Sequence, residues 1–140
     1  KKNSVYVGQP VVDAYGVMGQ VIEVGPLTSR VMLVNDPRSA LPVEDNRSEQ
    51  RAIVQGRGIA NLVTLNHVPK TADVKEQDLI VTSGLAAKFP QGYPVGRVIH
   101  IEDNPGEQFL TVDLELSAHV NRSRLVLLVW PNTAEDGDSD

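Results

Sequence analysis

The chain has 140 residues, of which 41% are hydrophobic but only 4% aromatic, and its formal net charge is −5. This length suits one ordinary domain or two very small ones, with a core of Val, Leu and Ile. The acidic balance argues against nucleic-acid binding, and the absence of cysteine excludes disulfides, thiolate metal sites and cysteine nucleophiles. No apolar run approaches the ~20 residues of a membrane helix, so we expect a soluble segment whose anchor, if any, lies upstream.

Short apolar and β-branched runs recur along the whole chain, separated by turn-forming Gly, Pro, Asn and Asp residues. Many short strands with such turns indicate an all-β sandwich or barrel. A possible turn or two of helix, with Ser117 as its N-cap, is expected only at 117–124. The predicted strands contain residues 11–12, 21–24, 31–34, 52–54, 62–65, 79–82, 98–101, 109–116 and 125–130.

Two of these runs carry distinct burial patterns. Residues 111–116 alternate strictly, which places Val112, Leu114 and Leu116 on one face of a strand and polar residues on the other. Residues 125–130 are apolar throughout, as expected of a strand that is covered on both sides.

A faint internal repeat relates residues 18–24 (MGQVIEV) to residues 95–101 (VGRVIHI). Two copies of a glycine-then-strand unit predict two small barrels, 1–57 and 58–131, divided near Gly56-Arg57-Gly58, although one barrel may borrow a strand from the other half. The second copy alone carries an insertion, at 85–94. Residues 132–140 contain four acidic side chains and no large apolar one, so we expect a disordered acidic tail.

Catalytic and metal sites find little support. Ser83 follows a predicted strand, but a serine there is usually a turn residue, and none of the three histidines at 67, 100 and 119 is placed beside it with an Asp. The acidic pairs 44–45 and 102–103 are interpreted as solvated turn charges, and no set of residues has metal-ligand spacing. We therefore expect no enzyme activity, no metal and no cofactor. A chymotrypsin-like serine hydrolase and a peptidoglycan-binding β-module remain alternatives.

One segment is more specific. Residues 82–98, TSGLAAKFPQGYPVGRV, contain three glycines and two prolines and predict an articulated loop that enters a strand. The loop gathers Phe89 and Tyr93, the residue types that anchor protein interfaces, beside Leu85. These three residues are the candidate partner contacts. The alternative is that Phe89 closes the end of a barrel.

This loop resembles the signature of the MreC family of rod-shape-determining proteins. Strand segments near 10–21, 29–36 and 57–58 also resemble the family, so the likeness covers most of residues 5–130. Ala86 and Ala87 depart from the usual paired glycines, and Gln77 stands where a glycine before Asp78 is common. The loop match runs through Thr82, Ser83, Gly84, Leu85, Phe89, Pro90, Gly92, Pro94, Val95, Gly96 and Val98.

The resemblance implies a fold and a function. The fold would be two six-stranded β-barrels with chymotrypsin-like, Greek-key topology and little helix. The function would be that of a non-catalytic scaffold in the bacterial cell-elongation complex, in the periplasm, held at the inner membrane by one helix outside this chain. Its implied partners are the elongation class B penicillin-binding protein, the membrane protein MreD and further copies of itself.

Overall fold

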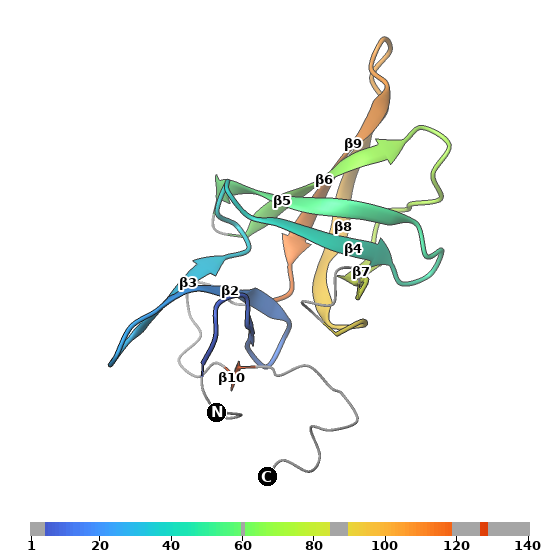
Figure 1. Cartoon of the computed structure of the whole chain (residues 1–140). Helices are drawn as coiled ribbons and strands as arrows, with labels where there is room; N and C mark the ends of the chain where they lie inside the picture. Colours follow the sequence, from blue (N-terminus) through green and yellow to red (C-terminus); the bar gives the residue numbers. More distant parts are fainter. Residues whose placement is uncertain (1–4, 60, 85–89, 119–126, 129–140) are drawn as a thin grey trace.

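The computed structural model describes residues 5–59, 61–84, 90–118 and 127–128 (Figure 1). The described part is all-β and contains no helix, so no helix there could cross a membrane. The ten strands are β1 Pro10–Val12, β2 Val17–Val24, β3 Ser29–Leu33, β4 Ala40–Asp45, β5 Arg51–Ile59, β6 Leu62–Pro69, β7 Leu79–Thr82, β8 Pro94–Glu102, β9 Phe109–Leu116 and β10 Leu127–Leu128.

The strands form two antiparallel sheets. The first has the order β10-β1-β2-β3, so it takes a strand from the far end of the chain. The second is a closed barrel in the order β4-β5-β6-β9-β8-β7, in which every strand has two neighbours. Figure 1 shows the barrel as the larger body, with the first sheet packed below it and the β2–β3 hairpin projecting to one side.

The all-β class and one closed six-stranded barrel are thus as predicted from the sequence. The described strands of the other sheet form an open sheet, and a second barrel with chymotrypsin-like topology stays a prediction. The division between the sheets also differs from the predicted boundary at 57/58. It falls between Leu33 and Ala40. Strands β4 and β5 therefore belong to the closed barrel, although the predicted boundary placed β4 and most of β5 in the first unit.

Gly56, Arg57 and Gly58 lie inside β5 rather than in a turn between barrels. Gly56 has another reason to be glycine. A Cβ atom there would collide with the backbone of Asn35 and Asp36, in the segment that joins the two sheets. The glycine therefore permits close approach of two backbones, a use of glycine that a sequence pattern does not separate from a turn.

Strand β4 is absent from the sequence prediction, and its acidic end was wrongly interpreted. The pair Glu44-Asp45 was predicted to be solvated turn charges. In the structure Glu44 and Asp45 are both buried, and β4 lies between β5 and β7. The other predicted pair, Glu102-Asp103, is exposed as expected.

The barrel core consists of branched aliphatic side chains, as the scarcity of aromatics predicts. The alternation of β9 is confirmed, because Val112, Leu114 and Leu116 are all buried. A smaller cluster lies in the first sheet and contains Val11, Met18, Val21 and Ala118. Fully buried members of the barrel core include Val54, Val63, Val68, Ile80, Val95, Val98, Val112 and Leu114.

The sequence repeat has a structural counterpart in β2 and β8. Gly19 and Gly96 hold the same position in the repeat, and at each a Cβ would collide with the backbone of the neighbouring strand. Three residues later, at Ile22 and Ile99, both strands carry an irregularity in register. Such bulges bend a strand and increase its twist. The two repeats therefore encode the same bent strand, once in each sheet.

Candidate partner-binding site

Thr82, the last residue of β7, closes the signature loop. Its side chain is completely buried. The Thr82 hydroxyl donates to the Pro90 carbonyl at 2.6 Å and accepts from the Tyr93 amide at 2.9 Å. Its backbone completes the closure, since the Thr82 amide donates to the Tyr93 carbonyl and the Gly92 amide donates to the Thr82 carbonyl, both at 2.9 Å. One residue thus fixes both ends of the segment between β7 and β8.

The glycines of the signature supply backbone shapes that other residues adopt with strain. Gly84 has φ +77° and Gly92 has φ +100°, both in the left-handed region. A Cβ at Gly84 would also press against Gln91. Ser83, directly before Gly84, is buried, and its amide donates to the Pro42 carbonyl of β4 at 3.4 Å. The loop is therefore held to the barrel as well as to itself.

The far side of the loop contacts both sheets. Gln91 donates through Nε2 to the buried carboxylate of Glu44 at 2.9 Å. Tyr93 is half-buried and packs against the barrel core. Pro94 approaches Gly16 of the first sheet so closely that a Cβ at Gly16 would overlap the Pro94 carbonyl. The signature residues thus gather where the barrel meets the first sheet.

The predicted partner contacts are only partly visible. Tyr93 is described and half-exposed, whereas Leu85 and Phe89 lie outside the described residues, as do Ala86 and Ala87. Of the remaining signature residues, Thr82, Ser83, Gly84, Pro90, Gly92 and Pro94 come together at the loop. Gly96 lies further along β8, against the backbone of Glu115.

A second polar cluster, which the sequence analysis missed, joins the β4–β5 turn to the segment before β7. The Arg47 guanidinium binds two carboxylates, donating to Asp78 at 2.9 and 3.1 Å and to Asp73 at 2.9 and 3.0 Å. Asp45 accepts through Oδ1 from the backbone amides of Arg47 and Ser48. Arg47 lies 26 positions from Asp73 and 31 positions from Asp78 in the sequence, so no local motif predicts these contacts.

Asp45 has an unusual environment. It is 1% exposed, and its Oδ2 is buried without a hydrogen bond to a donor. Burial, followed by the neighbouring Asp78 carboxylate, raises the pKa of Asp45 to about 6. Hydrogen bonds from Arg47 hold the pKa of Asp78 well below its usual range. Asp45 therefore takes up a proton at a higher pH than an ordinary aspartate, whereas Asp78 stays ionised.

The described residues do not assemble a hydrolytic or metal site. Two of the three histidines are described: His67 contacts the ring of Phe109 edge-on, and His100 lies 3.6 Å from Glu102. His119 lies outside the described residues. Across the described ranges no group of three His, Cys, Asp or Glu side chains could hold a metal ion.

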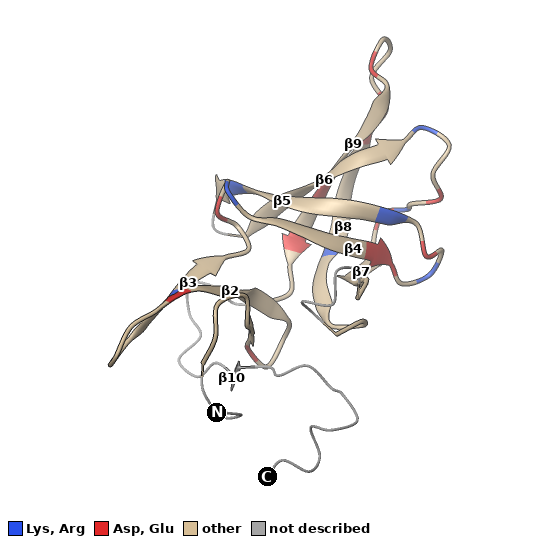
Figure 2. Ribbon diagram, in the orientation of Figure 1, with Lys and Arg blue, Asp and Glu red and all other residues tan. Residues whose placement is uncertain are grey.

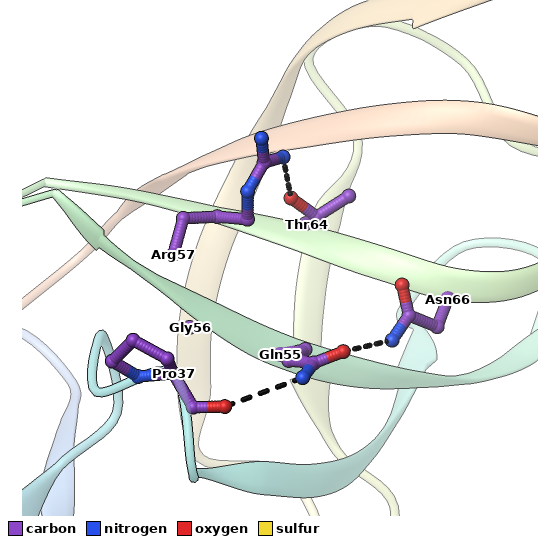
Figure 3. Close-up of a pocket in the computed structure, with 6 residues that line it drawn as sticks. All are labelled: Pro37, Gln55, Gly56, Arg57, Thr64 and Asn66. Carbon is purple, nitrogen blue, oxygen red and sulfur yellow. Dashed lines mark hydrogen bonds between the residues drawn. The ribbon is translucent and has the colours of Figure 1, made fainter.

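A shallow hollow of about 420 Å³ lies on the outer face of β5 and β6 (Figure 3). Its polar side chains bond one another across the strands. Arg57 donates to the Thr64 hydroxyl at 2.8 Å, and Asn66 donates to Gln55, which in turn donates to the Pro37 carbonyl at 3.2 Å. Such mutual pairing makes the lining of the hollow polar, unlike the mostly apolar clefts that bind small molecules.

The fold and the loop define a class: a β-barrel protein whose distinctive feature is a closed loop at the junction of two sheets. Comparison with known families agrees and is more specific. The family model "Rod shape-determining protein MreC, barrel core" matches residues 1–130, so the chain belongs to the MreC family. Its curated members determine cell shape and are structural proteins rather than enzymes.

Curated relatives confirm the assignment. The cell shape-determining protein MreC of Haemophilus influenzae is 42% identical over 135 residues, which are 96% of this chain and 38% of that protein. The same protein of Escherichia coli is 40% identical over 128 residues, which are 91% of this chain and 35% of that protein. The chain thus spans little more than a third of the length of these relatives.

Solved structures support the fold. The crystal structure of MreC from Pseudomonas aeruginosa is 49% identical, with a TM-score of 0.86 over 90% of this chain and 81% of that one. A complex between Penicillin-Binding Protein (PBP2) and MreC from Helicobacter pylori also matches, with a TM-score of 0.70 and 21% identity over 91% of this chain and 78% of that one.

Proposed function

We propose that this chain is part of a non-catalytic scaffold of the bacterial cell-elongation complex, which binds and organises the peptidoglycan transpeptidase and self-associates. Membership of the MreC family is the observation that carries this proposal. The Helicobacter pylori complex supports the choice of partner, since a protein of the same fold is bound there to a penicillin-binding protein. Neither a serine hydrolase nor a peptidoglycan-binding module is favoured by a specific observation.

The wider setting belongs to the same proposal. We place the domain in the periplasm, attached to the inner membrane by a single helix outside this chain, with MreD as a membrane partner. We also propose that the first sheet is the core of a second barrel with chymotrypsin-like topology. The shared glycine and bulge of β2 and β8 support that assignment, and we propose that the boundary between the two units lies at 34–39, which sheet membership supports.

The signature loop is our candidate surface for the transpeptidase. Thr82 closes it, and it lies at the junction of the two sheets, where Tyr93 is half-exposed. Proline at 90 and 94 restricts the backbone and lowers the entropy lost on docking. We propose that Leu85, Phe89 and Tyr93 make the contacts.

Binding and stability measured on the same variants test this surface. Affinity for an immobilised class B penicillin-binding protein should fall by ~2 kcal/mol, about thirtyfold, in Phe89→Ala. If Phe89 instead closes the barrel, Phe89→Ala should cost ~3–5 kcal/mol of unfolding free energy and leave affinity unchanged. Tyr93→Ala should lose both affinity and stability, because its ring packs on the core.

The matched control is Phe109→Ala, which removes an exposed aromatic ring from β9, remote from the loop in sequence. It should keep full affinity. Equal loss of affinity in Phe109→Ala and Phe89→Ala would remove the loop as the binding surface. A wild-type chain that fails to bind the transpeptidase at all would contradict the proposed function itself.

A further inference from the structure

The β2–β3 hairpin extends beyond the body of the molecule and exposes apolar side chains. Leu27 at its tip is 95% exposed, and Val24 and Val31 on its two strands are also exposed. Residues 24–29 carry no charge, and Figure 2 shows the outer end of the hairpin as uncharged beyond the Glu23–Arg30 ion pair. A two-stranded hairpin without support is only marginally stable in water, so this one gains from a further contact.

Strand β3 offers that contact a free edge. Among the described strands it pairs with β2 on one side and has no neighbour on the other. Its residues Ser29, Arg30 and Val31 are all exposed, so the edge is open to solvent. An open strand edge is a template for pairing with another chain.

The pairing of β2 and β3 determines which backbone groups point outward. Val34 donates to the Met18 carbonyl at 2.7 Å, and Gly25 donates to the Thr28 carbonyl at 2.8 Å. Hydrogen-bonded pairs alternate along an antiparallel ladder. Counting from either end, the amides and carbonyls of Ser29, Val31 and Leu33 face away from β2. The Leu33 carbonyl already accepts from Asp36 at 3.0 Å, so Ser29, both groups of Val31 and the Leu33 amide remain.

We propose that two copies of this chain pair through β3, antiparallel, about a two-fold axis at Val31. This inference specifies the self-association that the proposed function includes. In this register the two Val31 residues exchange both backbone hydrogen bonds, and each Leu33 amide donates to the Ser29 carbonyl of the other copy. The two first sheets then become one continuous sheet.

Charge favours this register over one centred on Arg30. Centred on Val31, the pairing sets each Arg30 opposite Met32 of the other copy. Centred on Arg30, it would use the outward-facing groups of Ser29 and Val31 but would place two guanidinium groups opposite each other, which is destabilising. The central Val31 pair also buries two half-exposed apolar side chains, which the edge leaves open in a single copy.

Analytical ultracentrifugation of the chain and of two matched lysine variants tests the proposal. Val31→Lys introduces charge at the centre of the edge, and Val24→Lys introduces the same charge at an exposed valine of β2, away from the edge. The dimer dissociation constant should rise at least about tenfold in Val31→Lys and change little in Val24→Lys. Circular dichroism should show both variants folded.

Cross-linking provides a second readout, because the chain contains no cysteine. The Cα atoms of a hydrogen-bonded antiparallel pair lie ~5.5 Å apart, within the range of a disulfide. Val31→Cys should therefore form a covalent dimer under mild oxidation. Leu27→Cys, more exposed but beyond the paired segment, should stay largely uncoupled at the same concentration.

The outcomes separate the two levels of the proposal. A wild-type chain that stays monomeric at high concentration overturns self-association, and β3 pairing with it. A chain that associates equally well with Val31→Lys, without Val31→Cys dimers, overturns only the β3 edge. Loss of transpeptidase binding in Val31→Lys with intact self-association would assign the edge to the transpeptidase and also overturn the pairing.

Discussion

Thr82 and Tyr93 bind each other twice, once through the Thr82 hydroxyl and once through its amide, each at 2.9 Å. This double contact joins the end of β7 to the start of β8 and holds the signature loop between them. The side chain and backbone of Thr82 together therefore fix where the loop leaves the barrel.

Thr82→Val tests the role of that hydroxyl. Valine fills the same space but leaves the Tyr93 amide and the Pro90 carbonyl without their partner in a buried place. We expect a loss of about 1–3 kcal/mol of unfolding free energy by chemical denaturation. Thr82→Ser keeps the hydroxyl and should lose only ~1 kcal/mol for the missing methyl group. A Thr82→Val variant as stable as the wild type would mean that the hydrogen bonds of the hydroxyl do not stabilise the loop.

The raised pKa of Asp45 predicts a pH dependence of stability. The folded-state pKa of Asp45 is about 6, above its unfolded value of ~3.9, so its contribution to stability is present at low pH and is lost as pH rises from about 4 to 6. Asp45→Asn replaces the carboxyl group by an amide of the same shape that does not titrate. Its stability relative to the wild type should therefore rise by about 1–3 kcal/mol between pH 4 and pH 7.

Asp73 and Asp78 contribute in the opposite sense. Hydrogen bonds from Arg47 lower the pKa of both carboxyls, so their contribution to stability is lost as pH falls below their unfolded value of ~3.9.

The control for Asp45→Asn is Asp45→Ala. It removes the acceptor of the Arg47 and Ser48 amides and should be less stable than Asp45→Asn at every pH. A difference in stability between wild type and Asp45→Asn that is constant from pH 4 to 7 would contradict the raised pKa of Asp45.

Gln77 occupies a backbone position that favours glycine. Its φ is +77°, and its amide and carbonyl bond Val98 and the Arg97 side chain, so a glycine could keep both hydrogen bonds. Relief of the left-handed strain, ~1–2 kcal/mol, exceeds the entropy cost of glycine. We expect Gln77→Gly to be slightly more stable than the wild type in thermal unfolding. Gly92→Ala, with φ +100°, should instead lose ~1 kcal/mol or more.

Gly56 should tolerate no side chain. The backbone of Asn35 and Asp36 occupies the place of its Cβ, so Gly56→Ala must push the linker away from β5. We expect a loss of about 1–3 kcal/mol in urea unfolding. Gly106, in the exposed β8–β9 turn with φ +88° and open space around it, is the control for backbone strain alone. A smaller loss in Gly56→Ala than in Gly106→Ala would show that the linker moves freely.

Ser83 should not react with a serine-directed fluorophosphonate. It is buried, its amide bonds Pro42, and the described histidines contact Phe109 and Glu102 instead. Mass spectrometry after incubation should find Ser83 unmodified. Stoichiometric labelling at this residue would overturn the assignment of the chain to a structural role.

Local patterns predicted most strands because the exposed face of each differs in polarity from its buried face. Strand β9 is the clearest example, with its strict alternation. Strand β4 was missed because Pro42 and two acidic residues suggest a turn, and only the contacts of the folded barrel bury Glu44 and Asp45. Local sequence does not record the hydrogen bond that Gln91 donates to the buried Glu44 carboxylate across the barrel.

The candidate site, too, could be predicted from the sequence only in part. The signature identified the loop and its glycines, since left-handed positions such as Gly84 and Gly92 leave a residue-type signal. The role of Thr82 carried no such signal, because its partners Pro90 and Tyr93 are determined by how the chain returns to the barrel.

The pairing of β1 with β10 sets an order of assembly. Every strand of the closed barrel lies between Ala40 and Leu116, so this unit can complete itself before the end of the chain is available. Strand β1 must wait for Leu127 and Leu128, more than 110 positions later, and contacts between such distant residues form slowly. We therefore expect the barrel to fold before the first sheet is complete. A chain that ends before residue 127 should keep the barrel but lack the β1–β10 pairing of the first sheet.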